Sequence, residues 1–221
     1  MGILTTLFAA GAVGGASASL PKTDGSVSPG ISPVDLDYNL IPMLVKKEDG
    51  KLIFSDCPEY ADNYGILYEG TVEKGKGRVY YYHVNETGKP ARVLVYAKSD
   101  KKQDITVTRT VKGDPSADYM PTGATLSFRE AVNEAGDPVL VKLLPKERTV
   151  LFEDDKKGIR SGDLVSGIVE IETKKPVSLG VAIVPDGTKE DVKKALDLSV
   201  PLLPDSHEMR GTFPMDVYME N

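Results

Sequence analysis

A repeated alternation of short apolar runs with turn-forming clusters constrains the fold of this chain more than any other feature. From Val34 onward the apolar runs recur at spacings of roughly 8–15 residues, which is the rhythm of an all-β sandwich. The runs at 104–110 and 169–172 alternate apolar and polar residues, as strands do when one face is packed and the other solvated. The predicted strands are Pro42–Lys46, Lys51–Ser55, Ile66–Val72, Arg78–Val84, Ala91–Ala97, Asp104–Thr110, Val139–Leu144, Thr149–Phe152, Leu164–Glu172 and Val177–Val184.

Two segments depart from this rhythm and are predicted to be short helices. Ser127 followed by Glu130 matches a capping box, and an apolar stripe follows within residues 128–135. Thr188 with Asp191 repeats the cap pattern ahead of a second apolar stripe. Because strands and helices do not alternate in βαβ units, we expect an all-β fold. We expect an antiparallel β-sandwich, Ig-like or jelly-roll-like, in which each of the two short helices caps a sheet edge or one end of the sandwich.

The first part of the chain has a different composition. Residues 3–18 are apolar and small, with no charge before Lys22. They provide the apolar core and the cleavage site of an export signal but not its basic n-region. They are also too short and too rich in Gly for a transmembrane helix. The other interpretation is an assembly arm that adds a strand to a neighbouring subunit. We therefore divide the chain into a signal-like segment or arm at 1–18, a flexible linker at 19–33 and a single β-sandwich domain at 34–221.

The charge balance excludes several classes of partner and cofactor. The net charge is -6, from 27 Lys and Arg against 33 Asp and Glu. Nucleic acids and anionic membranes select for basic patches, so we expect neither as the main partner. Cys57 is the only cysteine and the chain has two histidines, which excludes a disulfide within the chain, a multi-cysteine metal site and a three-histidine site. We expect no metal and no cofactor.

The run at 78–85 is the segment richest in binding chemistry. On a strand, Tyr80 and Tyr82 lie on one face, and Tyr81 and His83 lie on the other. One interpretation is an aromatic platform for a glycan or a peptide, with His83 as a polar contact. The more ordinary one is that strand tyrosines fill a sandwich core and reach its rim with their hydroxyls. The candidate ligand-binding residues are Tyr80, Tyr82, His83, His207 and Arg210.

Nothing in the sequence forms a recognisable catalytic pattern. Asp205, Ser206 and His207 are neighbours in sequence, whereas the members of a catalytic triad are brought together by folding. No serine lies in a G-x-S-x-G turn. Cys57 has acidic neighbours, which do not favour a thiolate. We therefore expect a protein that is not an enzyme and has no catalytic residues.

Three local patterns predict loops. Residues 153–158 are expected to be a charged hairpin loop with solvated side chains. Residues 85–87 form an N-glycosylation sequon in a turn. The RGTFP run at 210–214 is expected to be a strand-and-turn element of the fold, because it suits a tight turn with a buried ring, and a contact surface is the alternative.

Several motifs resemble a known group of proteins. They are ILYEGTV at 66–72, the tyrosine-rich strand that ends in His83-Val84-Asn85, and RGTFP at 210–214. Together they resemble exported proteins of Gram-positive-type bacteria that are labelled copper amine oxidase N-terminal-domain-like or stalk-domain proteins. The resemblance implies export, a cell-wall or extracellular setting and a non-catalytic β domain. It does not imply copper chemistry, because Asn63-Tyr64 is followed by Gly65 instead of an acid, and because two histidines are too few.

Two functions from different classes are consistent with these patterns. The first is a non-enzymatic, secreted or cell-surface β-sandwich with an envelope-structural or adhesive role. In one variant it is a self-assembling fibre or surface-layer subunit that uses the N-terminal arm. The second is a carbohydrate- or peptide-binding module of the cell wall. The expected partners are the protein itself, other cell-envelope proteins or glycans, without an integral membrane span.

Overall fold

The computed structural model describes residues 44–46, 50–206, 209–215 and 218–220. These residues divide between two compact units. In the smaller one, β1 (Leu44–Lys46) pairs antiparallel with β13 (Tyr218–Glu220). The predicted segment 1–18, the linker 19–33 and the start of the domain at Val34 lie outside the described residues.

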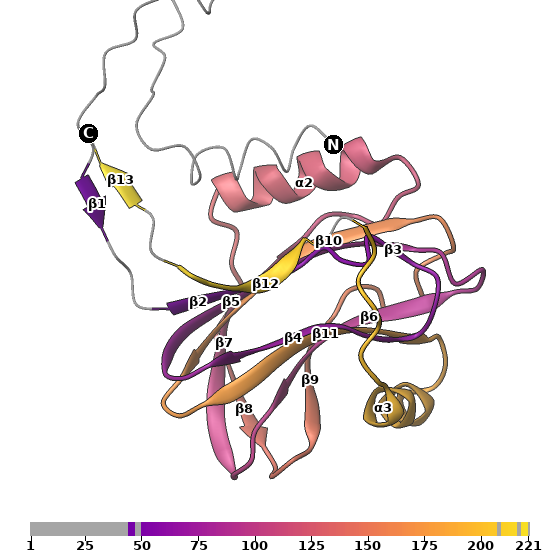
Figure 1. Ribbon diagram of the computed structural model, residues 1–221. Helices are drawn as coiled ribbons and strands as arrows, with labels where there is room; N and C mark the ends of the chain where they lie inside the picture. The colour runs from indigo at the N-terminus through magenta and orange to yellow at the C-terminus, as the bar shows by residue number, and fades with distance from the viewer. Residues whose placement is uncertain (1–43, 47–49, 207–208, 216–217, 221) are drawn as a thin grey trace, which may run out of the picture. The chain divides into compact units, whose positions relative to one another are not determined.

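The larger unit, from Gly50 to Met215, contains two stacked sheets (Figure 1). One sheet has seven strands, in the order β12-β2-β5-β10-β7-β8, with β3 also paired to β5. Its neighbours are antiparallel, except that β2 and β3 run parallel to β5. The strands are β2 Gly50–Ser55, β3 Tyr60–Ala61, β5 Gly75–Asn85, β7 Gln103–Lys112, β8 Val139–Leu143, β10 Leu164–Thr173 and β12 Arg210–Pro214.

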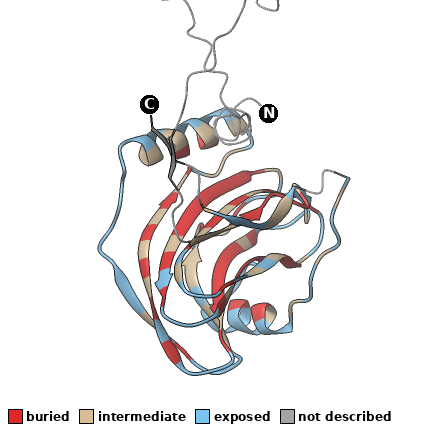
Figure 2. Cartoon of the chain, turned by 60° about the vertical axis from the view of Figure 1, so that its left-hand side comes forward, coloured by how far each residue is buried: buried red, intermediate tan, exposed pale blue. Residues whose placement is uncertain are grey.

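The second sheet has four antiparallel strands in the order β4-β11-β6-β9. They are β4 Gly65–Val72, β6 Ala91–Lys98, β9 Arg148–Glu153 and β11 Val177–Pro185. The main core lies between the sheets, and it includes Ile53, Tyr81, Val95 and Leu179. Buried positions alternate with half-buried or exposed ones along β5 and β7, and Figure 2 shows this banding. The expected all-β sandwich with two short helices is confirmed.

The helix α2 (Tyr119–Ala131) covers the outer face of the seven-stranded sheet (Figure 1) and not an edge or an end. The predicted capping box is wrong, because the N-cap is Asp118 and Ser127 lies within the helix. The buried face consists of Thr122 and Leu126, so the predicted stripe at 128–135 points to solvent. Tertiary packing determines this orientation of α2, because the sheet beneath the helix packs against the face that contains Leu126.

The helix α3 (Lys189–Leu198) covers the outer face of the four-stranded sheet. Its predicted cap is confirmed, since the Thr188 hydroxyl accepts a hydrogen bond from the Asp191 N–H and the Asp191 carboxylate accepts one from the Thr188 N–H. Val192 and Leu196 are the buried residues of this helix. In the described part of the chain, neither α2 nor α3 is long and apolar enough to cross a membrane.

The strands β3, β12 and β13 are additions to the predicted set. The RGTFP run forms β12, an edge strand that pairs antiparallel with β2, so the expected strand element is present and the expected tight turn is wrong. The ring of Phe213 is 45% exposed and is not buried. A short run with Gly and Pro carries little strand propensity of its own, and its extended form here is supported by the hydrogen bonds that β2 offers.

Candidate functional site

The tyrosine-rich strand β5 separates two chemically different faces, as the sequence predicted. Tyr81 and His83 point into the sandwich and are fully buried. Tyr80 and Tyr82 lie on the outer face and are half-buried. The structure therefore divides the predicted candidates between the core and the surface.

The candidate His83 is part of a buried hydrogen-bond chain. Its Nδ1 lies 2.8 Å from the carbonyl oxygen of Pro58, and its Nε2 lies 2.9 Å from the hydroxyl of Ser55. Because a carbonyl oxygen only accepts, Nδ1 carries the proton and Nε2 accepts from Ser55. Burial lowers the pKa of His83 to about 4, so the ring is neutral at pH 7. The pair resembles a nucleophile and its base, but both side chains are 0% exposed.

Cys57 and Arg210 are engaged in contacts that join loops to strands. The Cys57 thiol donates to the Asp205 carboxylate at 3.3 Å, and burial together with this hydrogen bond raises the pKa of the thiol. The guanidinium of Arg210 donates to the carbonyl oxygens of Leu67, Leu202 and Cys57 at 2.8, 3.2 and 3.3 Å. Arg210 thus ties β12 to β4 and to the loop after β2. The remaining candidate, His207, lies outside the described residues.

The two outer tyrosines of β5 have different surroundings. Tyr80 packs under α2 with Leu126 and stacks on Phe54, with ring centroids 5.5 Å apart. Burial raises the pKa of Tyr80 to about 12. This tyrosine therefore fills the layer between helix and sheet, and not the sandwich core that the ordinary interpretation expected. Tyr82 belongs to a different cluster.

A cluster of tyrosines and carboxylates forms where the chain leaves β2 and returns as β3. It consists of Tyr60 from β3, Tyr82 from β5, Tyr119 from the first position of α2, and Asp56 and Glu59 from the loop between β2 and β3. Burial, Glu59 and Asp56 raise the pKa of Tyr82, and Tyr60 and Tyr119 add to this effect. Burial and the Tyr60 hydroxyl raise the pKa of Tyr119 to about 12. We call this group the tyrosine–carboxylate cluster.

The strand register explains why this cluster forms. β2 pairs with residues 76–81 of β5, and β3 pairs with Val84 and Asn85. Residues 56–59 therefore loop out beside Tyr82, between two strands that both run parallel to β5. Sequence reasoning selected Tyr82 but missed Tyr60, Tyr119 and the two carboxylates. No local pattern predicts that these separate segments meet.

Asp56 is the least satisfied member of the tyrosine–carboxylate cluster. The residue is 5% exposed, and its Oδ1 has no hydrogen-bond partner among the described residues. Burial raises the pKa of Asp56 to about 8, and the charges of Glu59 and Asp205 contribute to the increase. Native proteins seldom leave a buried acceptor unpaired, so this oxygen is a place where a ligand donor is expected.

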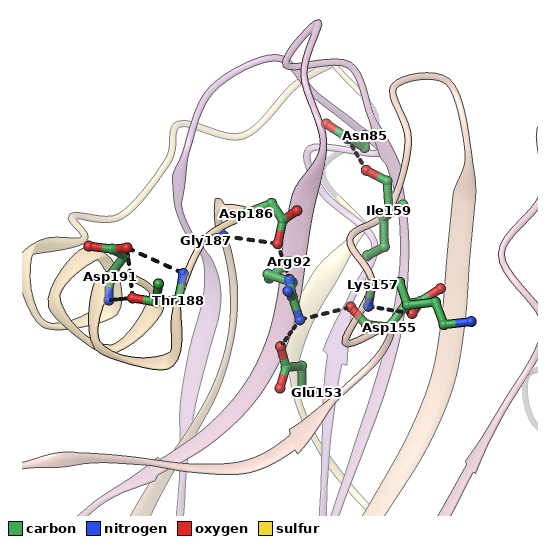
Figure 3. Close-up of polar contacts among 10 residues, drawn as sticks. All are labelled: Asn85, Arg92, Glu153, Asp155, Lys157, Ile159, Asp186, Gly187, Thr188 and Asp191. Atoms are coloured by element: carbon green, nitrogen blue, oxygen red, sulfur yellow. Dashed lines mark hydrogen bonds and ion pairs between the residues drawn. The ribbon is translucent and has the colours of Figure 1, made fainter.

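A second polar cluster surrounds Arg92, and each of its carboxylates accepts a hydrogen bond within the chain (Figure 3). Arg92 donates to Glu153 and to Asp186, and Asp186 also accepts from the N–H of Gly187. Asp155 accepts from the N–H of Lys157. Because each of these carboxylates accepts from a donor in the chain, the cluster fixes loops.

The same region corrects two sequence expectations. Asp154 is not solvated: its side chain is 0% exposed, accepts from the Tyr81 hydroxyl and lies 3.0 Å from the Lys112 ammonium. Asn85, the acceptor residue of the sequon, is 1% exposed. Its amide donates to the carbonyl oxygen of Ile159 (Figure 3) and to that of Lys89, so it has a structural role in the fold.

Within the described ranges, no group of three or more His, Cys, Asp or Glu side chains is arranged to hold a metal ion. A comparison of the chain with protein-family models, curated proteins and solved structures finds no match in any of the three. The resemblance to stalk-domain proteins thus stays a prediction, and the function is argued from the chain's own residues.

Proposed function

We propose that this chain is a non-enzymatic β-sandwich protein of the cell surface that acts by binding, in an adhesive or envelope-structural role. The observation that carries the proposal is the contrast between the two faces of β5. Ser55 and His83, the pair with nucleophilic chemistry, are sealed in the core. The tyrosine–carboxylate cluster lies on the outer face, where Tyr60 is 45% exposed. Among the described residues, the Tyr60 ring reaches the surface, and the Ser55–His83 pair does not.

The construction of the cluster favours binding. Its tyrosines come from β3, β5 and α2, and regular elements hold side chains more firmly than loops do. Tyrosine offers a large contact area at a low cost in conformational entropy, which explains why it dominates binding surfaces. The export-like residues 3–18, the acidic charge and the resemblance to stalk-domain proteins support a setting outside the cell.

The self-assembling variant of this proposal is supported by the edge strand β8. This strand ends the order of the seven-stranded sheet, and its Val139 and Leu140 are 55% and 71% exposed. An edge strand with apolar side chains is a surface to which an extended segment of another copy adds. We propose that the apolar residues 3–15 supply that segment. Deletion of residues 1–20 is expected to abolish assembly and to leave the monomer folded. Normal assembly of the deleted chain contradicts the variant.

The experiment for the main proposal is co-sedimentation of the full chain with isolated cell envelopes. We expect saturable binding that Tyr60→Leu weakens, without release of soluble sugars or peptides. Phe213→Leu is the matched control, because both rings are 45% exposed and they lie on different strands. Release of soluble product that a single substitution abolishes overturns the non-enzymatic proposal. Absence of binding overturns the adhesive role.

A further inference from the structure

We propose that the tyrosine–carboxylate cluster binds an organic cation, namely the ammonium or guanidinium group of a basic peptide side chain. The inference rests on the proposed binding function and names its class of ligand. Strand pairing places residues 56–59 and Tyr60 beside Tyr82 and Val84 of β5, and Tyr119 at the start of α2 also acts on Tyr82. Tyrosine rings attract cations through their negative faces, and the attraction increases when a carboxylate lies nearby.

The charge around the cluster has one sign. The groups that act on Tyr82 and Tyr119 are other tyrosines and the carboxylates of Asp56, Glu59 and Glu86. None of these three carboxylates forms an ion pair with a described residue. A ligand cation therefore supplies the positive charge that the described residues do not place here.

The nearby arginines of the outer face and of β12 are already occupied. Arg78 pairs with Glu130 and with Glu170, both outside the cluster. Arg210 donates to backbone carbonyl oxygens on the other side of the loop. Neither guanidinium is available to neutralise the tyrosine–carboxylate cluster without breaking contacts that the fold uses.

Asp56 provides the independent observation for this site. It is 5% exposed, and its Oδ1 has no donor in the described structure. Ser55, the residue before it, points into the core toward His83, so alternation along the strand directs Asp56 to the face of Tyr82. A buried acceptor without a donor costs free energy that a ligand N–H recovers. Ammonium and guanidinium groups carry several such donors.

Two other classes of ligand fit this cluster less well. A metal ion needs several free oxygens, but the Asp205 carboxylate accepts from the Cys57 thiol and from the Glu59 N–H. A neutral sugar stacks on tyrosines and leaves the negative charge of Glu59 uncompensated. An organic cation satisfies the aromatic faces, the unpaired oxygen and the charge together.

The test uses the full chain with ¹³C-labelled tyrosine and follows the ring signals by NMR. The probes are N-acetyl-lysine methylamide, N-acetyl-arginine methylamide, the uncharged N-acetyl-norleucine methylamide and a chito-oligosaccharide. We expect saturable shifts of Tyr60, Tyr82 and Tyr119 with the two cations. The norleucine analogue should bind at least about tenfold more weakly, because it lacks the charge. Equal shifts with norleucine overturn the inference.

Two substitutions and two controls locate the site. Tyr60→Leu should raise the Kd for the lysine probe by about fivefold or more, and Asp56→Asn should do so at pH 9, where the Asp56 carboxyl is ionised. Phe213→Leu and Glu190→Gln change an exposed ring and an exposed carboxylate away from the cluster, and they should leave the Kd unchanged. Thermal melts show whether each variant is folded. Unaltered binding by folded Tyr60→Leu and Asp56→Asn proteins contradicts the site.

The outcomes separate this inference from the proposed function. If the oligosaccharide shifts the cluster tyrosines and the cations do not, the ligand class is wrong and the binding function stands. If no probe shifts them and the chain does not sediment with envelopes, both proposals fail. Envelope binding that competes with the lysine probe supports both.

Discussion

The hydroxyl of Ser55 donates a hydrogen bond to Nε2 of His83 across 2.9 Å, inside the sandwich, where neither side chain is exposed. The bond connects β2 to β5, and Nδ1 of the same ring donates to Pro58 in the loop that follows β2. One neutral imidazole therefore fixes the path of residues 55–58. These residues lead into the tyrosine–carboxylate cluster, so the core pair determines where Asp56 is placed.

This pair predicts a loss of stability in acid. Burial lowers the pKa of His83 to about 4, whereas an unfolded histidine titrates near 6.5. Below pH 6.5 this histidine binds a proton in the unfolded chain but not in the folded chain. The free energy of unfolding therefore decreases as the pH falls from about 6.5 to 4. The loss should reach about 3 kcal/mol at pH 4. Urea unfolding of wild type and His83→Gln between pH 7 and 4 measures it. Parallel pH profiles contradict the prediction.

Asp56 predicts a pH dependence of the opposite sign. Burial raises its pKa to about 8, so the folded chain holds a proton that the unfolded chain releases near pH 4. The contribution of this group to the free energy of unfolding of the wild type has its full value below pH 4 and is lost as the pH rises to about 8. Asp56→Asn should therefore stabilise the protein by about 1–3 kcal/mol at pH 8.5, and the gain should disappear near pH 4.

The effect of Asp56 is measured as the difference in free energy of unfolding between wild type and Asp56→Asn at each pH. The wild-type curve alone is not enough, because His83 changes stability in the opposite direction between pH 4 and 6.5. Asp62→Asn, at an exposed position, is the control and should change stability little. A destabilised Asp56→Asn protein at pH 8.5 would mean that Asp56 makes a favourable charged interaction, and it would contradict the unpaired carboxylate.

The buried Asp154 predicts the effect of removing one hydroxyl. Tyr81 is fully buried and donates to Asp154, whose other oxygen lies 3.0 Å from the Lys112 ammonium. Tyr81→Phe leaves a buried carboxylate with one donor fewer, so it should reduce the free energy of unfolding by about 1–3 kcal/mol. Tyr82→Phe, on the outer face of the same strand, should change it by less than about 0.5 kcal/mol. Equal effects in urea unfolding contradict the assigned role of Asp154.

The sequence predicted features that depend on local periodicity. The alternation in 104–110 placed Ile105 and Val107 inward, because one-sided burial of a strand is visible in its own residues. The cap at Thr188 was predicted for the same reason, since both partners lie within one turn of the helix. The division of β5 into a core face and an outer face also follows from alternation alone.

Features that depend on pairing between distant segments were missed. The extended form of β12 depends on β2, and the burial of Asp154 depends on Tyr81 from another strand. The tyrosine–carboxylate cluster combines a loop, two strands and a helix end, so its members share no spacing. A single sequence shows which side chains have binding chemistry but not which of them meet.

The helix α2 gives a test of this distinction, because sequence and structure assign its buried face differently. The sequence stripe contains Phe128, whereas the structure buries Leu126 at 5% exposure and leaves Phe128 67% exposed. Leu126→Ala should therefore reduce the free energy of unfolding by about 2–4 kcal/mol, because it opens a cavity against Val111 and Ile168. Phe128→Ala should cost less than about 0.5 kcal/mol. Urea unfolding of both variants measures the difference, and a larger loss from Phe128→Ala means that a partner or another part of the chain covers the outer face of α2.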